Sequence, residues 1–209
     1  MNRFGTLQTH VAELREALVS LERQAAEIEH WGARLARLYD DDGRLLVAGN
    51  GGSAAEAQHL TAELVGRFEG ERRPLSAIAL HAETSSVTAI GNDYGYDEVF
   101  ARQVEAHGRR GDVLLLLSTS GRSENLLAAA RRASRAGLEV WALAGAPGSP
   151  LSRLADRHVC VDAPSTSAIQ EAHLVVVHAL CAAVERRLPG AHRRDVPQQT
   201  GLGNLVGLP

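Results

Sequence analysis

Apolar residues recur at helical spacing over the first forty positions of the chain. The stripe consists of Val11, Leu14, Leu18, Leu21, Ala25 and Ile28, and it continues through Trp31, Leu35 and Leu38. Steps of three and four residues predict a long amphipathic helix from about Thr6 to Asp40. Such a helix has to bury its apolar stripe, and part of it could lie on a second copy of the chain. We therefore expect a homo-oligomer.

From Arg44 onward, short apolar runs alternate with helical patterns. Runs typical of strands occupy residues 44–48, 75–80, 112–117, 139–144 and 158–161, and helical patterns lie near 54–68, 85–91, 98–106, 123–136 and 166–188. Runs such as VLLLL are apolar throughout, as in parallel strands that are covered on both faces. The pattern predicts one α/β domain over residues 1–188, with a doubly wound, parallel, five-stranded sheet of the flavodoxin-like type. Residues 189–209, rich in Gly, Pro and Arg, are expected to form a mobile tail.

Composition removes several classes of function. The net charge of -3 gives no basic field for nucleic acid or an anionic membrane. All 22 basic residues are arginines, which excludes Schiff-base lysine chemistry and the lysine of a P-loop. No apolar run approaches transmembrane length, and the N-terminus lacks a signal-peptide pattern. Cys160 and Cys181 lie in apolar stretches and are expected to be free thiols, which favours a cytoplasmic location.

Glycines and hydroxyl groups gather in two loops that follow predicted strands. The first loop reads Ala48-Gly49-Asn50-Gly51-Gly52-Ser53, and the second reads Ser118-Thr119-Ser120-Gly121-Arg122-Ser123. Each leads into a helix, where backbone N–H groups, hydroxyls and the helix dipole favour a phosphate. Either loop alone could be an ordinary turn with a capping serine. Two of them at the carboxyl ends of strands predict a phosphate site.

Nucleotide sites fit these loops poorly. The chain lacks GxxxxGK[ST], and GNGGSA matches only a loose form of the dinucleotide fingerprint. The next predicted strand closes with Leu80-His81, without the acidic residue that would hold a ribose.

Histidine, carboxylate and amide side chains recur in two helical stretches. His59 and Glu63 are four residues apart and share one helix face. Gln170 and His178 lie about 80° apart around an ideal helix and can line one broad face. Each pattern alone is compatible with a surface contact or a core histidine, and HxxxE is not the HExxH of metalloproteases. Together they make a candidate metal or acid–base site.

The motifs as a set resemble the sugar isomerase (SIS) domain and, within it, the phosphoheptose isomerases, which act on sedoheptulose 7-phosphate. The similarity is carried by AGNGGSAAEAQHLTAELVGRF, AIGNDYGYDEVFARQVEAHGRRGDVLLLLSTSGRSEN and AIQEAHLVVVHALC, which cover most of residues 45–181 in the family's order. The resemblance implies a cytoplasmic enzyme with the SIS fold. It also implies a homotetramer with active sites between subunits.

The resemblance further implies roles for individual residues. One zinc ion per subunit would be held by His59, Glu63, Gln170 and His178. Substrate would be bound by Asn50, Gly51, Gly52, Ser53, Glu63, Asn92, Asp93, Ser118, Thr119, Ser120, Ser123 and Gln170, with the hydroxyl groups on its phosphate. Arg122 stands where many members have asparagine, and Ser167 stands where many have aspartate.

The implied reaction converts sedoheptulose 7-phosphate to D-glycero-D-manno-heptose 7-phosphate through a cis-enediol(ate). Glu63 would be the base and His178 the acid, and zinc would polarise the carbonyl. Two alternatives stay open. One is a phosphosugar-binding SIS regulator without catalysis, and the other is an SIS isomerase for a different sugar phosphate. The presence of both Glu63 and His178 favours the phosphoheptose isomerase.

Overall fold

A five-stranded parallel sheet forms the centre of the computed structural model, which describes residues 6–188. Its strands are β1 (Leu45–Gly49), β2 (Ala77–Ala79), β3 (Val113–Ser118), β4 (Glu139–Ala144) and β5 (Arg157–Cys160). They lie in the order β2-β1-β3-β4-β5, so the direction of winding reverses between β1 and β3. The predicted doubly wound sheet is confirmed. The tail predicted for residues 189–209 lies outside the described residues.

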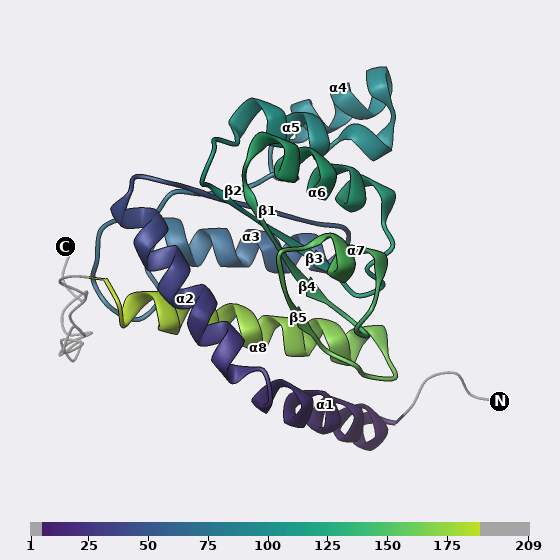
Figure 1. Cartoon of the computed structure of the whole chain (residues 1–209). Helices are drawn as coiled ribbons and strands as arrows, with labels where there is room; N and C mark the ends of the chain where they lie inside the picture. The colour runs from purple at the N-terminus through teal and green to yellow at the C-terminus, as the bar shows by residue number, and fades with distance from the viewer. Residues whose placement is uncertain (1–5, 189–209) are drawn as a thin grey trace, which may run out of the picture.

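Helices cover both faces of this sheet (Figure 1). On one face pack α2 (Ala25–Asp40), α3 (Gly52–Val65) and α8 (Thr166–Glu185); on the other pack α5 (Ala101–His107), α6 (Glu124–Ala136) and α7 (Pro150–Leu154). Beyond the second layer lies α4 (Thr84–Tyr94) (Figure 1). The 3-10 turn η1 (Tyr96–Glu98) contacts α4, α5 and α6, and α1 (Leu7–Glu22) contacts α8. The sequence pattern did not predict α7, because five residues are too few to show a helical period.

The N-terminal segment is helical, as predicted, but it is divided at Arg23–Gln24. The side-chain amide of Gln24 accepts a hydrogen bond from the backbone N–H of Cys160 and donates one to the carbonyl oxygen of the same residue. Gln24 thus pairs with β5 as a strand residue would. This contact gives a physical reason for the break that the apolar spacing could not reveal.

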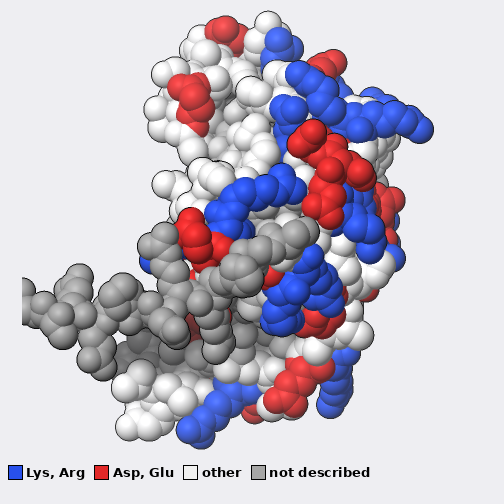
Figure 2. All heavy atoms as spheres, turned by 90° about the vertical axis from the view of Figure 1, so that its left-hand side faces the viewer, with Lys and Arg blue, Asp and Glu red and all other residues white. Residues whose placement is uncertain are grey.

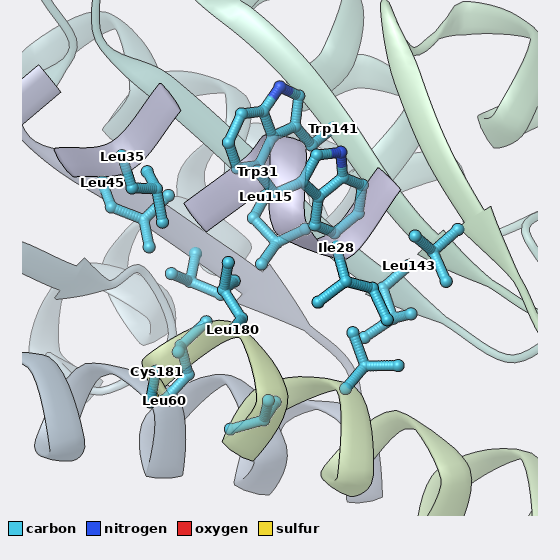
Figure 3. Packing of buried hydrophobic residues seen from close by; sticks show 14 of the residues in the cluster. Ile28, Trp31, Leu35, Leu45, Leu60, Leu115, Trp141, Leu143, Leu180 and Cys181 are labelled. Carbon is cyan, nitrogen blue, oxygen red and sulfur yellow. The ribbon is translucent and has the colours of Figure 1, made fainter. Parts of the chain in front are cut away.

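Alternation along the strands separates two cores. Leu45 and Leu115 face α2 and α8, whereas their neighbours Leu46 and Leu114 face the opposite helix layer. In the first core the rings of Trp31 and Trp141 stack with centroids 4.8 Å apart and planes inclined by 16° (Figure 3). Since every strand residue from 113 to 118 is buried, the sheet has little freedom to shift, and the loops at its carboxyl end are fixed in place.

The expectation that no apolar run approaches transmembrane length was wrong for α8, which is long and apolar enough for a membrane span by length and composition alone, with a mean hydropathy of 1.5. However, 56% of that stretch is buried inside the protein, where α8 packs on α1, α2 and α3. The core helix of a globular domain has the same character. Leu174 and Val175 remain exposed on its outer side.

One face of the molecule carries charged side chains of both signs (Figure 2). Arginines and acidic side chains gather together there, rather than forming a uniform basic area. This mixture agrees with the net charge of -3. It gives no support to an electrostatic nucleic-acid surface on this face.

Candidate functional site

A small cavity of about 80 Å³ lies at the carboxyl ends of β1 and β3, where the two predicted loops meet. Its lining consists of Asn50, Ser53, Leu117, Ser118, Thr119, Ser120, Ser123 and Gln170. Five of these eight residues carry a hydroxyl group, and none carries a formal charge. The structure therefore brings the hydroxyl residues predicted for the phosphate site, together with Asn50 and Gln170, into one place. Such a lining suits an oxyanion that is bound by donors without a fixed counter-charge.

The second loop leaves the hydroxyl hydrogens of its serines available for donation. Ser118 Oγ accepts a hydrogen bond of 3.0 Å from the N–H of Gly121, and Ser120 Oγ accepts one of 3.3 Å from the N–H of Arg122. A hydroxyl that already accepts still has its own hydrogen to give. Ser123 stands at the N-cap of α6, yet its side chain makes no capping hydrogen bond. These hydroxyls, beside a helix N-terminus, can therefore turn towards a bound phosphate.

The first loop is shaped by close approach to α8. A Cβ atom at position 52 would lie 2.3 Å from Nε2 of Gln170, so a side chain there would displace that amide. Gly51 has φ +55°, a conformation that glycine adopts without strain. Ser53 follows in the first turn of α3 and is buried in the cavity wall. The glycines thus place Gln170 directly against the start of α3.

A pair of amides connects the two loops. Asn50 Nδ2 donates to Asn125 Oδ1 at 3.0 Å, and Asn125 Nδ2 donates back to Asn50 Oδ1 at 2.9 Å. The hydroxyl of Tyr96 also donates to Asn50 Oδ1, at 3.3 Å. Asn125 is 3% exposed. Sequence reasoning missed Asn125 and Tyr96; the one available signal was an asparagine in the first turn of a helix that otherwise buries apolar side chains.

Imidazole and carboxylate groups form a second cluster further along α3 and α8. His59 Nε2 lies 3.0 Å from His178 Nε2 and 3.5 Å from Glu63 Oε1. The ring of Phe68 stacks on His178 with centroids 5.7 Å apart. The His59 side chain is 42% exposed and that of Glu63 is 24% exposed, so small molecules can reach the cluster. The structure therefore brings His59 close to both His178 and Glu63, and the catalytic and metal-binding roles predicted for these three residues stay predictions.

A buried ion pair supports this cluster from behind. Glu185 accepts hydrogen bonds from the N–H groups of Phe68, Glu69 and Gly70 and from Arg72 Nε. The Arg72 guanidinium in turn donates to the carbonyl oxygens of Glu63 and Leu64. Together Glu185 and Arg72 fix the segment after α3. They thereby hold in place both the end of α3, which carries Glu63, and the Phe68 ring that stacks on His178. The spacing of motifs in the sequence gave no indication of this pair.

The cavity and the His–Glu–His cluster lie at two levels of the same parallel helix pair. Gly52 meets Gln170 at one level, and His59 meets His178 at the other. Seven residues of α3 and eight of α8 separate the two levels, which corresponds to about 10–12 Å along the helices. A ligand that reaches both sites must therefore be a chain molecule rather than a compact anion.

Asn92 and Asp93 lie apart from this cavity. Both are exposed on α4, where Asn92 Nδ2 donates to Asp93 Oδ1 at 2.8 Å. Neither lines the cavity, and α4 stands at the outside of the opposite helix layer (Figure 1). Their predicted contact with substrate stays a prediction.

Comparison with known proteins gives consistent matches. The SIS domain model matches residues 9–145. A phosphoheptose isomerase from Streptomyces coelicolor is 61% identical over 86% of this chain and 78% of its own length. The chain belongs to the phosphoheptose isomerases of the SIS domain family. Solved phosphoheptose isomerases from Francisella tularensis and Neisseria gonorrhoeae share 34% and 39% identity, with TM-scores of 0.77 and 0.72; each match covers 87% of this chain and 100% of the other.

These homologues indicate an enzyme of the sugar-phosphate isomerase class. The hydroxyl cavity is formed by the loops that the SIS domain match covers, whereas Gln170 and His178 on α8 lie beyond residue 145. The phosphoheptose isomerases from Streptomyces coelicolor and Helicobacter pylori align over 86% and 88% of the chain, so they extend the similarity further than the domain model does.

The zinc site implied by the phosphoheptose isomerase resemblance fits the observed donors in part. In tetrahedral zinc with bonds of about 2.0–2.1 Å, neighbouring donor atoms lie about 3.4 Å apart. The 3.0 Å and 3.5 Å separations of His59 Nε2 from His178 and Glu63 are close to that value. Gln170 instead packs on Gly52, and within residues 6–188 no three His, Cys, Asp or Glu side chains, those of His59, Glu63 and His178 included, are arranged so that they could hold a metal ion as they stand. A full ligand set would need Glu63 and Gln170 to turn towards the imidazoles.

Proposed function

We propose that the chain isomerises sedoheptulose 7-phosphate to D-glycero-D-manno-heptose 7-phosphate. One observation carries the proposal: an uncharged hydroxyl cavity and a His–Glu–His cluster occupy two levels of one helix pair. An open seven-carbon chain with a terminal phosphate spans about 10 Å, because each bond of about 1.5 Å advances the extended chain by roughly 1.2 Å. That length matches the separation of the two levels. A triose phosphate, about half as long, would reach only one of them.

In this proposal the hydroxyls of Ser118, Ser120 and Ser123 and the start of α6 hold the phosphate. The anchored substrate then presents its carbonyl end to the cluster on α3 and α8. Because the phosphate is far from the reacting carbons, its binding fixes position without altering their chemistry. Leu117 at the cavity wall and the buried β3 behind it keep water from the inner side of the phosphate.

The proton transfers are assigned to two side chains. Glu63 removes a proton from C1 of the ketose, which gives a cis-enediolate, and returns a proton to C2. His178 gives a proton to the C2 oxygen and takes one from the C1 oxygen, so that atoms and charge balance. Positioned acid–base groups of this kind contribute roughly 10²–10⁴-fold in rate. Phe68 holds the His178 ring by stacking, and Arg72 holds the backbone at Glu63.

We also propose that His59, Glu63, Gln170 and His178 hold one zinc ion per subunit. When bound there, zinc would polarise the substrate carbonyl. Because coordinated Glu63 and His178 could not transfer protons freely, ligation of the ion and the acid–base roles of these two side chains would have to alternate. We propose in addition a cytoplasmic homotetramer. The location is consistent with the two cysteines, which are buried free thiols. The oligomer is consistent with the exposed Leu174 and Val175, which leave an apolar strip on the helix that carries His178.

The test is a substrate panel with two variants. Wild-type protein should convert sedoheptulose 7-phosphate faster than six-, five- and three-carbon ketose phosphates. Glu63→Gln should lower kcat by about 10²–10⁴-fold while leaving substrate affinity within a few-fold. Ser123→Ala should raise KM and leave kcat nearly unchanged. Tight binding of the heptose phosphate with no turnover by wild-type protein would instead identify a phosphosugar-binding regulator.

A further inference from the structure

Glu56 and His173 are buried together directly behind the hydroxyl cavity and take no part in the proposed reaction. Glu56 lies one turn after Ser53 on α3, and His173 lies one turn after Gln170 on α8. His173 is fully buried and Glu56 is 9% exposed. Their nearest polar atoms, His173 Nδ1 and Glu56 Oε2, are 3.9 Å apart. Both atoms are buried and lack a hydrogen-bond partner, an arrangement that is costly unless the two atoms serve each other.

The other ring nitrogen of His173 settles the direction of the hydrogen bond. His173 Nε2 lies 3.1 Å from the carbonyl oxygen of Ala144, which can only accept, so Nε2 carries a hydrogen. In the neutral ring Nδ1 is then an acceptor that needs a donor. A carboxylate cannot supply one, but a carboxylic acid can. Burial lowers the pKa of His173 to about 4 and raises the pKa of Glu56 to about 8, and both directions favour uncharged partners.

We propose that Glu56 is a protonated carboxylic acid that donates a hydrogen bond to Nδ1 of His173, and that this neutral pair positions the walls of the phosphate cavity. The proposal requires the two atoms, now 3.9 Å apart, to approach each other by about 1 Å to reach hydrogen-bond length. An ion pair of Glu56 with protonated His173 is the competing arrangement. It would place two charges in a site where the buried Glu56 Oε2 has no hydrogen-bond donor besides the imidazole, which burial makes unfavourable.

The pair connects three elements of the site. Ala144 ends β4 and stands opposite Ser118 in the sheet, and Gly145 donates its N–H to the Ser118 carbonyl. The chain of contacts therefore runs from α3 through Glu56 and His173 to the strand end beside Ser118. Glu56 and His173 are positioning residues, since neither lines the cavity. Their importance for sugar phosphate binding rests on the proposed function.

Two variants of Glu56 separate the possibilities. Glu56→Gln keeps the shape and an N–H donor, whereas Glu56→Met keeps the length and removes the donor. Infrared spectra of the wild-type protein at pH 7 should show a carboxylic acid C=O band that is absent from Glu56→Gln. Affinity for inorganic phosphate, measured by calorimetry, should fall about fivefold to tenfold in Glu56→Met and stay within twofold in Glu56→Gln. In nitrogen NMR of wild-type protein, His173 should be the neutral ring protonated at Nε2.

Absence of the carboxylic acid band, or a doubly protonated His173 ring at pH 7, would overturn the neutral pair. Unchanged phosphate affinity in Glu56→Met would overturn its positioning role. If Glu56→Met fails to fold, the infrared band and the NMR signals still decide the protonation state. The positioning role is then tested by comparing the phosphate affinity of Glu56→Gln with that of His173→Phe, which removes the imidazole and should bind phosphate more weakly. Because no readout requires turnover, the result is independent of the proposed isomerase activity.

Discussion

Asn50 and Asn125 exchange two hydrogen bonds, of 3.0 Å and 2.9 Å, and so join the loop after β1 to the helix after β3. The pairing is reciprocal, so each amide satisfies a donor and an acceptor of the other. Ser53 and Ser123, which lie on the two segments joined in this way, both line the phosphate cavity. The distance across that cavity is therefore set by an amide pair and not by the hydroxyl groups themselves.

Replacing Asn125 with leucine should loosen the cavity without touching its lining. The substitution removes both hydrogen bonds that the half-buried Asn50 amide makes to Asn125, at a cost of about 1–3 kcal/mol. We expect KM for the sugar phosphate to rise about tenfold and kcat to change less than threefold. Tyr96→Phe is the matched control, because it removes only the longer, exposed hydrogen bond to Asn50. Equal effects of the two variants would contradict the amide-pair account.

Metal content can be tested independently of activity. Purified wild-type protein should contain one zinc per subunit, measured by mass spectrometry of the metal after dialysis. His59→Ala should reduce the content to near zero, since it removes the imidazole that lies closest to both His178 and Glu63. His158→Ala, an exposed histidine on β5, should leave the content unchanged. Full zinc occupancy in His59→Ala would contradict the proposed ligand set.

Arg72 and Arg73 are neighbours in sequence with very different surroundings. Arg72 is buried against Glu185, whereas Arg73 makes an exposed ion pair with Asp40. Arg72→Met leaves a carboxylate buried without its cation, and we expect a loss of about 3–5 kcal/mol in the free energy of unfolding. Arg73→Met should cost no more than about 1 kcal/mol. Urea denaturation of both variants measures the difference. Similar losses of unfolding free energy in the two variants would show that the buried Arg72–Glu185 pair stabilises the fold no more than the exposed pair does.

The stability of the folded chain should depend on pH through Glu56. Burial raises the pKa of Glu56 from 4.5 to about 8, so between these values the folded chain keeps a proton that the unfolded chain releases. The stability that protonated Glu56 contributes to the folded chain is therefore fully present at low pH, and it is lost as the pH rises towards 8. Burial lowers the pKa of His173 from 6.5 to about 4, so that group acts mainly below pH 6.5 and in the opposite direction.

The window from pH 6.5 to 8 consequently isolates Glu56. Relative to Glu56→Gln, wild-type protein should lose up to about 2 kcal/mol of unfolding free energy across it. Denaturation midpoints of both proteins at several pH values provide the measurement. Parallel profiles would mean that Glu56 is ionised throughout this range.

The periodicity of apolar residues was sufficient to predict the strands and helices, but not the contacts that divide or connect them. Apolar runs placed all five strands close to their observed positions, because a parallel sheet that is buried on both faces needs such runs. The break at Gln24 was not predictable, since it depends on an amide that reaches β5 more than a hundred residues away. The resemblance identified His59, Glu63 and His178, and the fold brings them together.

The supporting residues of the site could not be read from spacing. Asn125, Arg72 and Glu185 act through contacts between elements that are distant in sequence, and none belongs to a repeated pattern. Gln170 shows that spacing can also predict a contact that the structure does not make. Helical geometry allowed it to share a face with His178, but packing against Gly52 holds its amide at the cavity, two turns away from the imidazoles.

Proton NMR of the purified protein with sedoheptulose 7-phosphate in D₂O addresses the isomerase assignment most directly. The account predicts an aldoheptose 7-phosphate product that carries solvent deuterium at C2, because Glu63 exchanges its proton with solvent between the two transfers. Glu63→Gln should form this product at least a hundredfold more slowly. A sugar phosphate that binds and is recovered unchanged, with no deuterium incorporated, would contradict the account.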